Sequence, residues 1–248
     1  MGAEETKIYI AILIAVAVLG IMLVYFIITI LRQQKSNFTL YNSKVQAEII
    51  TLEKERSRVA RDLHDDLAPL LLSIKYNINS FELPDTEDQL ILDKTNANLD
   101  SLIRRVREIA NDLLPEALLR KGLVTALEES TGKVYAKSGL HVDFRHDMIP
   151  ALPLDKSVNI YRIIQEVIHN TVKHAAAATL VIELKIAGHM LLLVTEDNGR
   201  GFDHNAGSKE FAGLGLRSLL SRTDILKGTM YLDSKAGEGT RYIFEIPV

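Results

Sequence analysis

The longest uncharged stretch of the chain is IYIAILIAVAVLGIMLVYFIITIL, from Ile8 to Leu31. At ~1.5 Å per residue a helix of this length spans roughly 36 Å, enough for the apolar core of a bilayer. Tyr9 and Tyr25 lie toward its two ends, where membrane helices often carry interfacial aromatic residues. A secretory signal is the rival interpretation, but the run is long for one and no small-residue cleavage site follows it. The sequence therefore predicts a transmembrane helix at residues 8–31.

The charged residues on either side of this run predict its orientation. Two glutamates precede it in the opening MGAEET, whereas Arg32, Lys35 and Lys44 follow it. Because basic flanks stay on the cytoplasmic side of a membrane, we expect residues 1–7 to be a short extracytoplasmic segment. The body beyond residue 31 is then cytoplasmic, attached to the cytoplasmic (inner) membrane by a single span.

Charge and cysteine content exclude several classes of function for this body. The formal net charge is -3, and the chain shows neither a clustered basic face nor the spacing of a helix-turn-helix or zinc finger, so we expect no direct binding to nucleic acid. The chain has no cysteine, which excludes disulfides, thiolate metal sites and cysteine nucleophiles.

A heptad register follows the apolar run. This spacing predicts a parallel coiled coil between two subunits, with residues 32–57 as its linker. The alternative is one amphipathic helix that packs on its own domain. The core positions recur at alternating steps of four and three, some of them polar: Phe38, Asn42, Val45, Ile49, Leu52, Arg56, Val59, Leu63, Asp66 and Leu70.

A second periodic helix is expected after a break at NSFELPDTED, which contains Pro84. Two helices joined by a short loop form an antiparallel hairpin, and two hairpins bury their apolar seams as a four-helix bundle. The sequence therefore predicts a homodimer. The second helix ends near Pro115, and its apolar positions are Leu92, Leu99, Ile103, Val106, Ala110 and Leu113.

From about residue 119 the pattern changes to mixed helix and strand. This order is typical of an α+β sandwich, with helices on one face of a mixed sheet. The expected elements are a helix that ends at Gly139, a strand in LHVDFRHD, a long helix N-capped by Asp155, two strands that turn near Gly188, a helix in GLRSLLSRTDILKG, and two closing strands, TMYLDSK and TRYIFEIPV.

The long helix carries the first of four chemical motifs, QEVIHNTVKHA. Glu166 and Asn170 share one helix face, followed by Lys173 and His174. A carboxylate and an amide oxygen at that spacing can hold Mg²⁺, with water and phosphate oxygens completing its octahedron. The alternative is a solvated polar face, with His174 interacting with the C-terminal end of the helix dipole.

The second motif, EDNGRGFD, follows an apolar strand. Asp197 ends that strand and can accept a hydrogen bond from an exocyclic amine such as that of adenine. Gly199 and Gly201 let the backbone approach a flat ring closely. An ordinary Asn-Gly hairpin turn is the alternative.

The third and fourth motifs also depend on glycine. In GLGLRSL, Gly213 and Gly215 lead directly into a helix, whose free N–H groups suit phosphate. A simple turn is the alternative interpretation of this glycine pair. In GEGTRYIFEIP, Gly239 and Thr240 start the last strand.

His64, in RDLHDDLAP, invites three interpretations: a buried core histidine, a metal ligand or a nucleophile. It follows the seam residue Leu63, so we expect it at the flank of the bundle, where a second domain can reach it. A neutral imidazole nitrogen is a competent nucleophile, and Asp65 can take the proton of the other ring nitrogen as general base and orienter. Asp65 and Asp66 point in different directions on a helix, which disfavours a metal site.

Together the four motifs resemble the N, G1 and G2 boxes and the closing Gly-Thr of the histidine kinase ATP-binding domain, which shares its fold with DNA gyrase and Hsp90 (the GHKL or Bergerat type). The resemblance implies that the chain uses ATP and Mg²⁺. It also implies Mg²⁺ at Glu166 and Asn170, phosphates near Lys173 and His174, the adenine amine on Asp197, the ring against Gly199 and Gly201, the hinge of an ATP lid (HNAGSKEFAG) at Gly213, Gly215 and Leu216, and Thr240 in the water network beside adenine.

The segment ERSRVARDLHDDL, with REIANDLLPEALLRKGLVTALEE, resembles the phosphoacceptor region of nitrate-sensor-type histidine kinases of two-component systems. The resemblance covers residues 45–248. It implies a dimerisation and histidine phosphotransfer domain at 58–118, a catalytic ATP-binding domain at 119–248 and a signalling role for the 32–57 linker. His64 would take the γ-phosphoryl group of ATP and pass it to an aspartate of a response regulator, typically one with a helix-turn-helix output domain.

Pro69 departs from this family pattern. Nitrate-sensor-type kinases usually carry a glutamine five residues after the histidine, which orients water to remove phosphate from the regulator. Proline there is typical of the larger histidine kinase class, whose water-positioning residue lies one position earlier, where this chain has Ala68. We therefore expect weak phosphatase activity. Because Pro69 lacks the N–H that would bond the Asp65 carbonyl, we also expect a kink one turn beyond His64.

Two functions of other classes remain as alternatives. One is an ATP-driven conformational machine of the same nucleotide fold that is not a kinase, and the other is a nucleotide-binding signalling scaffold at the membrane without catalysis. The histidine-bearing hairpin argues against the first, and the intact ATP motifs argue against the second.

Overall fold

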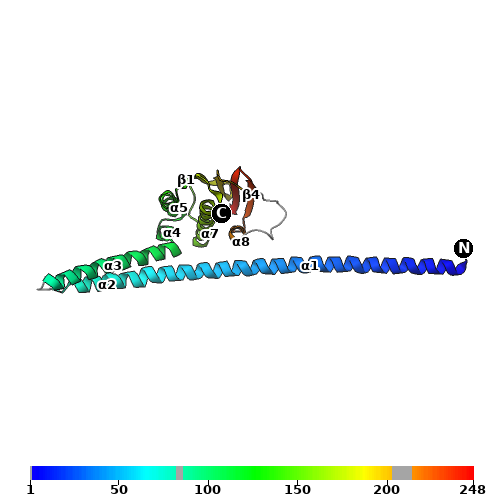
Figure 1. Cartoon of the computed structure of the whole chain (residues 1–248), viewed down its shortest axis with the longest axis horizontal. Helices are drawn as coiled ribbons and strands as arrows, with labels where there is room; N and C mark the ends of the chain where they lie inside the picture. Colours follow the sequence, from blue (N-terminus) through cyan, green and yellow to red (C-terminus); the bar gives the residue numbers. More distant parts are fainter. Residues whose placement is uncertain (1, 82–85, 203–213) are drawn as a thin grey trace. The chain divides into compact units, whose positions relative to one another are not determined.

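The structure is a computed structural model that describes residues 2–81, 86–202 and 214–248. Its contacts divide the chain into two units, Met1–Glu48 and Ile49–Val248. Helix α1 (Ala3–Asp62) runs through the first unit and supplies the first residues of the second (Figure 1).

The first unit is a helix with an exposed apolar surface. From Val16 onward the helix contains an 18-residue window of mean hydropathy 2.1, and none of that window is buried. The side chains of Leu19 and Tyr25, for example, are 68% and 72% exposed. By length and composition this stretch can cross a membrane. The span at residues 8–31 and its orientation stay predictions.

The second unit begins with the helical hairpin. Helix α1 passes through a π-helical turn, Leu63–Leu67, into α2 (Ala68–Asn79), and α3 (Thr86–Leu113) folds back beside α2 (Figure 1). The α3 helix ends two residues before Pro115, as expected. The apolar residues inside this hairpin are Leu71, Ile103 and Val106, with Leu63 and Leu99 against them.

A second set of apolar side chains on these helices lies open to solvent in the single chain. Leu52 and Leu70, both predicted seam positions, are 49% and 57% exposed. Ile74, Leu102 and Ile109 are similarly exposed. Apolar side chains exposed in this way favour contact with a partner.

The disturbance that Pro69 causes differs in form from the expected kink. The N–H of Ala68 donates to the carbonyl of Leu63, five residues back, so the helix widens over Leu63–Leu67. Pro69 then lies in the first turn of α2, where the missing N–H of proline costs nothing. The irregular turn therefore contains His64 itself and does not begin one turn beyond it.

Three short helices connect the hairpin to the sheet: α4 (Glu116–Arg120), α5 (Leu123–Thr131) and α6 (Val134–Ser138). The single helix expected up to Gly139 is therefore wrong. It divides because Gly132 ends α5, where the N–H of Lys133 turns back onto the carbonyl of Ser130. Gly139 ends α6 with a left-handed φ of 74°.

The C-terminal region contains a five-stranded sheet. Its order is β1-β2-β3-β5-β4; β1 is parallel to β2, and the other neighbours are antiparallel. The predicted mixed sheet is thus confirmed, with the turn between β2 and β3 at Gly188. The strands are β1 (His141–His146), β2 (Thr179–Ala187), β3 (Met190–Asp197), β4 (Thr229–Lys235) and β5 (Gly239–Pro247).

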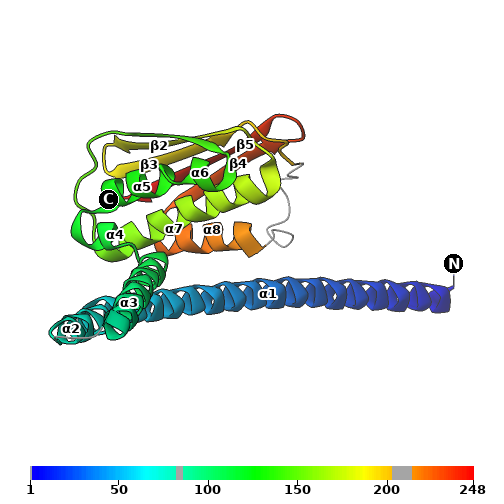
Figure 2. The ribbon, with the colours of Figure 1, turned by 60° about the vertical axis from the view of Figure 1, so that its left-hand side comes forward.

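Helices α7 (Leu154–Asn170) and α8 (Leu214–Ile225), with α5 and α6, cover one face of this sheet (Figure 2). Pro153 precedes α7 at the N-cap position, and Asp155 lies in the first turn, so the predicted Asp155 cap is wrong. Between helices and sheet lies one core. Its most deeply buried members include Ile160, Ile163, Leu180, Ile182, Leu184, Leu191, Leu193, Leu219, Phe244 and Ile246.

Candidate functional site

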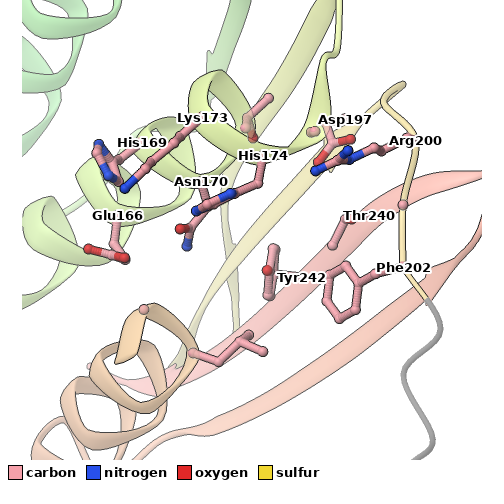
Figure 3. A pocket seen from close by; sticks show the side chains of 15 residues that line it. Glu166, His169, Asn170, Lys173, His174, Asp197, Arg200, Phe202, Thr240 and Tyr242 are labelled. Atoms are coloured by element: carbon pink, nitrogen blue, oxygen red, sulfur yellow. The ribbon is translucent and has the colours of Figure 1, made fainter. Parts of the chain in front are cut away.

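A cavity of about 530 Å³ opens where α7 ends, where α8 begins and where β3 and β5 supply side chains (Figure 3). Its size suits a nucleotide-sized ligand. Most of the motif residues predicted from the sequence meet here. The lining comprises Glu166, His169, Asn170, Thr171, Lys173, His174, Ala175, Asp197, Arg200, Gly201, Phe202, Gly215, Leu216, Thr240 and Tyr242.

Glu166 and Asn170 lie one turn apart on α7 beside the first turn of α8. A Cβ atom added to Gly215 would lie 2.5 Å from Glu166 Oε1 and 3.1 Å from Asn170 Oδ1. A larger residue at position 215 would therefore displace the Glu166 carboxylate from the N-terminal end of α8. A phosphate group and a hard cation have complementary partners in this space, namely helix N–H groups and oxygen donors.

These oxygen donors fit Mg²⁺ better than a softer metal. Within the described ranges no group of three or more His, Asp or Glu side chains could hold a metal ion by itself. Mg²⁺ tolerates this because it normally keeps several waters and binds proteins through one or two side chains plus substrate phosphates. Glu166 and Asn170 offer two such side-chain oxygens beside the first turn of α8.

A second π-helical turn, Thr171–Ala175, extends α7 and bears Lys173 and His174. Both side chains are exposed and line the cavity (Figure 3). The turn ends at Ala176, whose φ of 50° reverses the chain. Two basic-type side chains at the mouth of a cavity can neutralise a polyphosphate, so their predicted role suits their position.

Asp197 is a buried carboxyl group at the end of β3, 5% exposed. It accepts hydrogen bonds from the backbone N–H of Gly199, at 2.9 Å, and of Thr240. No ion pair joins it to a cation in the part of the chain that the structure describes. Burial therefore raises the pKa of Asp197, and the two N–H donors oppose that rise only in part. A carboxyl group with this little compensation gains from an additional donor, such as a ligand amine.

The glycines near Asp197 differ in position. Gly201 lines the cavity with φ of 56°, a conformation that favours glycine, and an added Cβ would lie 2.0 Å from the carbonyl oxygen of Lys235. Gly199 lies behind the cavity surface, where an added Cβ would lie 2.5 Å from the carbonyl oxygen of Ala175. Thr240 lines the cavity and shares a 3.0 Å hydroxyl contact with Ser234.

Two predicted features lie wholly or partly outside the described residues. Gly213 and the proposed lid, HNAGSKEFAG, belong to the range 203–213. Gly215 and Leu216, the other two hinge residues, are described and line the cavity.

Sequence reasoning missed several lining residues, of which Tyr242 is the most informative. It lies two residues after Thr240 on β5, so strand periodicity could have found it. Burial, followed by the charges of Asp197 and Glu166, raises the pKa of Tyr242 to about 12. Its hydroxyl group therefore stays protonated at neutral pH. The other missed residues are His169, Thr171, Ala175, Arg200 and Phe202.

A separate cavity of about 200 Å³ lies beside His64. The imidazole Nε2 is 3.2 Å from Arg120 Nη2 and 3.8 Å from Glu116 Oε1. The side chain is 37% exposed, which matches the predicted flank position and disagrees with a buried core histidine. This cavity shares no lining residue with the larger one, among the residues described.

Asp65 lines the same small cavity as His64. No hydrogen bond or ion pair joins Asp65 to His64 in the described structure. The role of Asp65 as general base stays a prediction. The residues that touch His64, Glu116 and Arg120, come from α4 and were not predicted.

The fold and site define a nucleotide-binding α+β domain that follows a helical hairpin with an accessible histidine. Two family models match these parts in the same order. Residues 55–118 match the model described as histidine kinase, and residues 155–248 match the model described as histidine kinase-, DNA gyrase B- and HSP90-like ATPase. The second match supports the use of ATP.

Curated relatives agree with these matches. The chain is 31% identical over 205 residues to the sensor histidine kinase ComP of Bacillus subtilis. The aligned region covers 78% of this chain and 26% of ComP. The chain is 27% identical over 214 residues to the oxygen sensor histidine kinase NreB of Staphylococcus carnosus, covering 84% of this chain and 61% of NreB. The chain thus spans less than two thirds of either relative.

Among solved structures, the histidine kinase domain of the blue-light-activated histidine kinase of Erythrobacter litoralis EL346 aligns with a TM-score of 0.47 and 20% identity. That alignment covers 74% of this chain and 95% of the other. The family-model matches and the curated relatives confirm the resemblance predicted from the motifs: the chain has the two domains of a protein-histidine kinase and is similar to sensor histidine kinases.

Proposed function

We propose that this protein is a membrane-anchored, homodimeric histidine kinase that transfers the γ-phosphoryl group of ATP to His64 and then to an aspartate of a response regulator. The observation that carries the proposal is the combination, in one chain, of an accessible histidine on a helical hairpin and a separate cavity lined by all four ATP motifs.

The lining residues of the larger cavity have complementary tasks in this proposal. Asp197 accepts the adenine amine, while Lys173 and His174 neutralise phosphate charge. Glu166 and Asn170 hold Mg²⁺ through their side-chain oxygens. When bound, Mg²⁺ neutralises the charge of the phosphate oxygens and aligns them for displacement.

His64 supplies the nucleophile. The lone pair of one imidazole nitrogen forms the bond to the γ-phosphorus, the bond from that phosphorus to the bridging oxygen breaks, and ADP leaves with the electron pair. The proton on the other ring nitrogen passes to Asp65 or to water. A carboxylate of the response regulator then takes the phosphoryl group from His64, which regains a proton.

The membrane and dimer parts of the proposal come from apolar surfaces that the single chain leaves open. The exposed helix from Val16 fits a bilayer span, and the basic residues after it favour a cytoplasmic body. The exposed row that includes Leu52 and Leu70 fits a second copy of the hairpin, packed as a four-helix bundle.

Phosphatase activity toward the regulator is expected to be weak. Ala68 is buried and Pro69 is exposed, and neither carries an amide or hydroxyl group that could orient a water molecule. Kinase-dependent loss of phosphate from the purified phosphorylated regulator, at a rate far above its own hydrolysis, would contradict this part of the proposal.

The test is labelling of the purified full chain with γ-labelled ATP. We expect His64→Gln and Asn170→Asp to abolish labelling, while His141→Gln, a change at an exposed histidine of β1, leaves it intact. The phosphate should be acid-labile and base-stable, which also separates a kinase from an ATP-driven machine or a scaffold of the same fold. Undiminished labelling of the His64 variant would contradict the proposal.

A further inference from the structure

We propose that Arg120 is a positioning residue for His64: it holds the imidazole with Nε2 unprotonated and then moves onto the incoming phosphoryl group. The inference deepens the proposed function and rests on it. Its basis is the contact of 3.2 Å between Arg120 Nη2 and His64 Nε2, the shortest polar contact of this ring in the described structure.

The direction of this hydrogen bond fixes the tautomer of His64. A guanidinium group only donates, so Nε2 must accept and cannot carry a proton. The single proton of the neutral ring is then on Nδ1. A doubly protonated ring would set two donors and two positive charges against each other at 3.2 Å. The structure thus identifies Nε2 as the nitrogen whose lone pair is available for attack.

Glu116 holds the guanidinium group in this position. Its Oε1 accepts from Arg120 Nε at 2.9 Å and lies 3.8 Å from His64 Nε2, too far for a hydrogen bond to the ring. The two residues are four apart on α4 and so share one face of that helix. The start of α4 is in turn held by a bond from the Glu116 N–H to Asn111 Oδ1 at 3.2 Å.

Because these groups are exposed, the contact of Arg120 with His64 Nε2 can orient the ring and still break when the phosphoryl group arrives. The side chains of Arg120 and Glu116 are 65% and 49% exposed, so the bond to Nε2 is weak and breaks easily. A weak bond is sufficient to select between two neutral tautomers of similar energy. A phosphoryl group carries more charge than an imidazole lone pair and offers oxygens for bidentate pairing, so the guanidinium group prefers it once it arrives.

When Arg120 moves to the phosphoryl group, the lone pair of His64 Nε2 is free to attack phosphorus. Nε2 forms the bond to phosphorus, the bond from phosphorus to the bridging oxygen of ATP breaks, and ADP carries away the electron pair. The Nδ1 proton leaves to Asp65 or water, so the ring ends neutral. Arg120 then donates to the phosphoryl oxygens, where before it donated to the ring. Asp65 has no bond to the ring in the described structure, which leaves the choice of tautomer to Arg120.

The experiment has two independent readouts on the full chain in lipid vesicles. Solid-state NMR with ¹⁵N-labelled histidine reports which nitrogen of His64 is protonated, and the resonance is assigned by its loss in His64→Gln. The rate of labelling by γ-labelled ATP reports the reaction. The variants are Arg120→Gln, the conservative Arg120→Lys, and Lys121→Gln, which removes the neighbouring cation that pairs with Glu129.

We expect wild-type His64 to be protonated on Nδ1 and Arg120→Gln to move protonation toward Nε2. The labelling rate of Arg120→Gln should fall by about 10-fold to 100-fold, because this variant cannot form the charge-assisted hydrogen bond to the phosphoryl oxygens. The KM for ATP should stay unchanged, because Arg120 does not line the nucleotide cavity. Arg120→Lys should recover part of the rate, and Lys121→Gln should behave as wild type.

Three outcomes would overturn the assignment: a wild-type His64 protonated on Nε2, an Arg120→Gln variant with unchanged tautomer and rate, or an equal loss in Lys121→Gln. Failure of the proposed function is distinguishable from these. If the wild type takes up no label, the kinase proposal fails, while the NMR comparison of wild type and Arg120→Gln still decides whether Arg120 sets the tautomer.

Discussion

Two ionic clusters on the same helical run differ sharply in burial. Glu53 on α1 pairs with Arg162 of α7 at 2.7 Å and with Arg222 of α8 at 3.2 Å, and all three side chains are 7–11% exposed. His64 lies eleven residues further along, close to the same helix face. Its partners Glu116 and Arg120 are half-exposed or more.

Each charged group of the buried cluster makes several hydrogen bonds, as buried charges must. Arg162 also donates to the carbonyl of Leu113 and to Gln165, and Arg222 donates to Asn159 Oδ1. Burial lowers the pKa of Arg222, and the charge of Glu53 opposes that shift. One carboxylate therefore ties α1 to the two helices that supply the nucleotide cavity. Burial thus makes the Glu53 cluster structural, whereas exposure leaves the His64 cluster free to exchange partners.

The largest expected effect is a loss of stability when the buried cluster loses the charge of Glu53. Glu53→Gln removes the negative charge and leaves two guanidinium groups facing each other without compensation. We expect the free energy of unfolding to fall by about 3–5 kcal/mol, as when one partner of a buried ion pair is deleted. Urea unfolding of the full chain, followed by circular dichroism, measures the loss.

The matched control is Glu55→Gln, two residues away. Glu55 pairs with the exposed Arg58, and we expect its variant to unfold within error of the wild type. Replacing Glu53, Arg162 and Arg222 together by Leu, Met and Met should recover most of the stability, because no charge of the cluster is then left unpaired. Equal stability of Glu53→Gln and Glu55→Gln would end the distinction between the two clusters.

The second prediction concerns Tyr242, whose pKa is raised chiefly by burial and further by the charges of Asp197 and Glu166. Its pKa of about 12 exceeds the usual 10.0, so above pH 10 the folded state keeps a proton that the unfolded state releases. Stability from this group is complete below pH 10 and is lost as pH rises through about 12. The loss should reach about 2–3 kcal/mol.

Tyr242→Phe should remove this dependence, so the wild type and the variant diverge only between pH 10 and about 12. The measurement is the urea midpoint of both proteins across that range. Parallel curves for the two proteins would mean that the Tyr242 hydroxyl group is not the source of the alkaline loss.

The third prediction concerns Asp197, which like Glu53 is a buried carboxyl group. Its hydrogen-bond donors are backbone N–H groups, whereas those of Glu53 are guanidinium groups. The raised pKa of Asp197 means that its ionised form is lost at a higher pH than for an ordinary aspartate. A bound adenine amine favours the ionised form, so ADP affinity should rise with pH through the range above 3.8 and level off once Asp197 is ionised without ligand.

Calorimetric titration of the full chain with ADP at several pH values tests this. Asp197→Asn should bind about 10-fold to 100-fold more weakly at neutral pH, because it loses one charge-assisted hydrogen bond. Its affinity should also be flat with pH. A pH dependence that persists in Asp197→Asn would assign the effect to another group.

The two clusters also show which parts of the site can be predicted from sequence. The residues of the nucleotide cavity occur in four short motifs whose internal spacing reflects local geometry, for example one helical turn between Glu166 and Asn170. Alternation of apolar residues was enough to predict the strands and the mixed sheet, because each strand buries one face. Local sequence patterns were therefore enough to predict most residues of the nucleotide cavity and most elements of the fold.

The ionic clusters have no local signal. Glu53 pairs with residues 109 and 169 positions away, and Arg120 meets His64 across 56 positions. Nothing in LEKER or EALLR shows these pairings before the chain is folded. The division of the helix before Gly139 was missed for a different reason: Gly132 marks the end of α5 locally, but it lies inside a pattern that otherwise continues as one helix.

The smallest expected effect is the change in stability when the exposed cluster loses the charge of Glu116. Glu116→Gln leaves a neutral amide beside Arg120, with both side chains in water. Exposed pairs contribute little, so the free energy of unfolding should change by less than about 0.5 kcal/mol. The same urea experiment that detects Glu53→Gln measures this variant. A loss comparable to that of Glu53→Gln would show that α4 depends on this pair for its packing, and the His64 cluster would then be structural and unable to exchange partners.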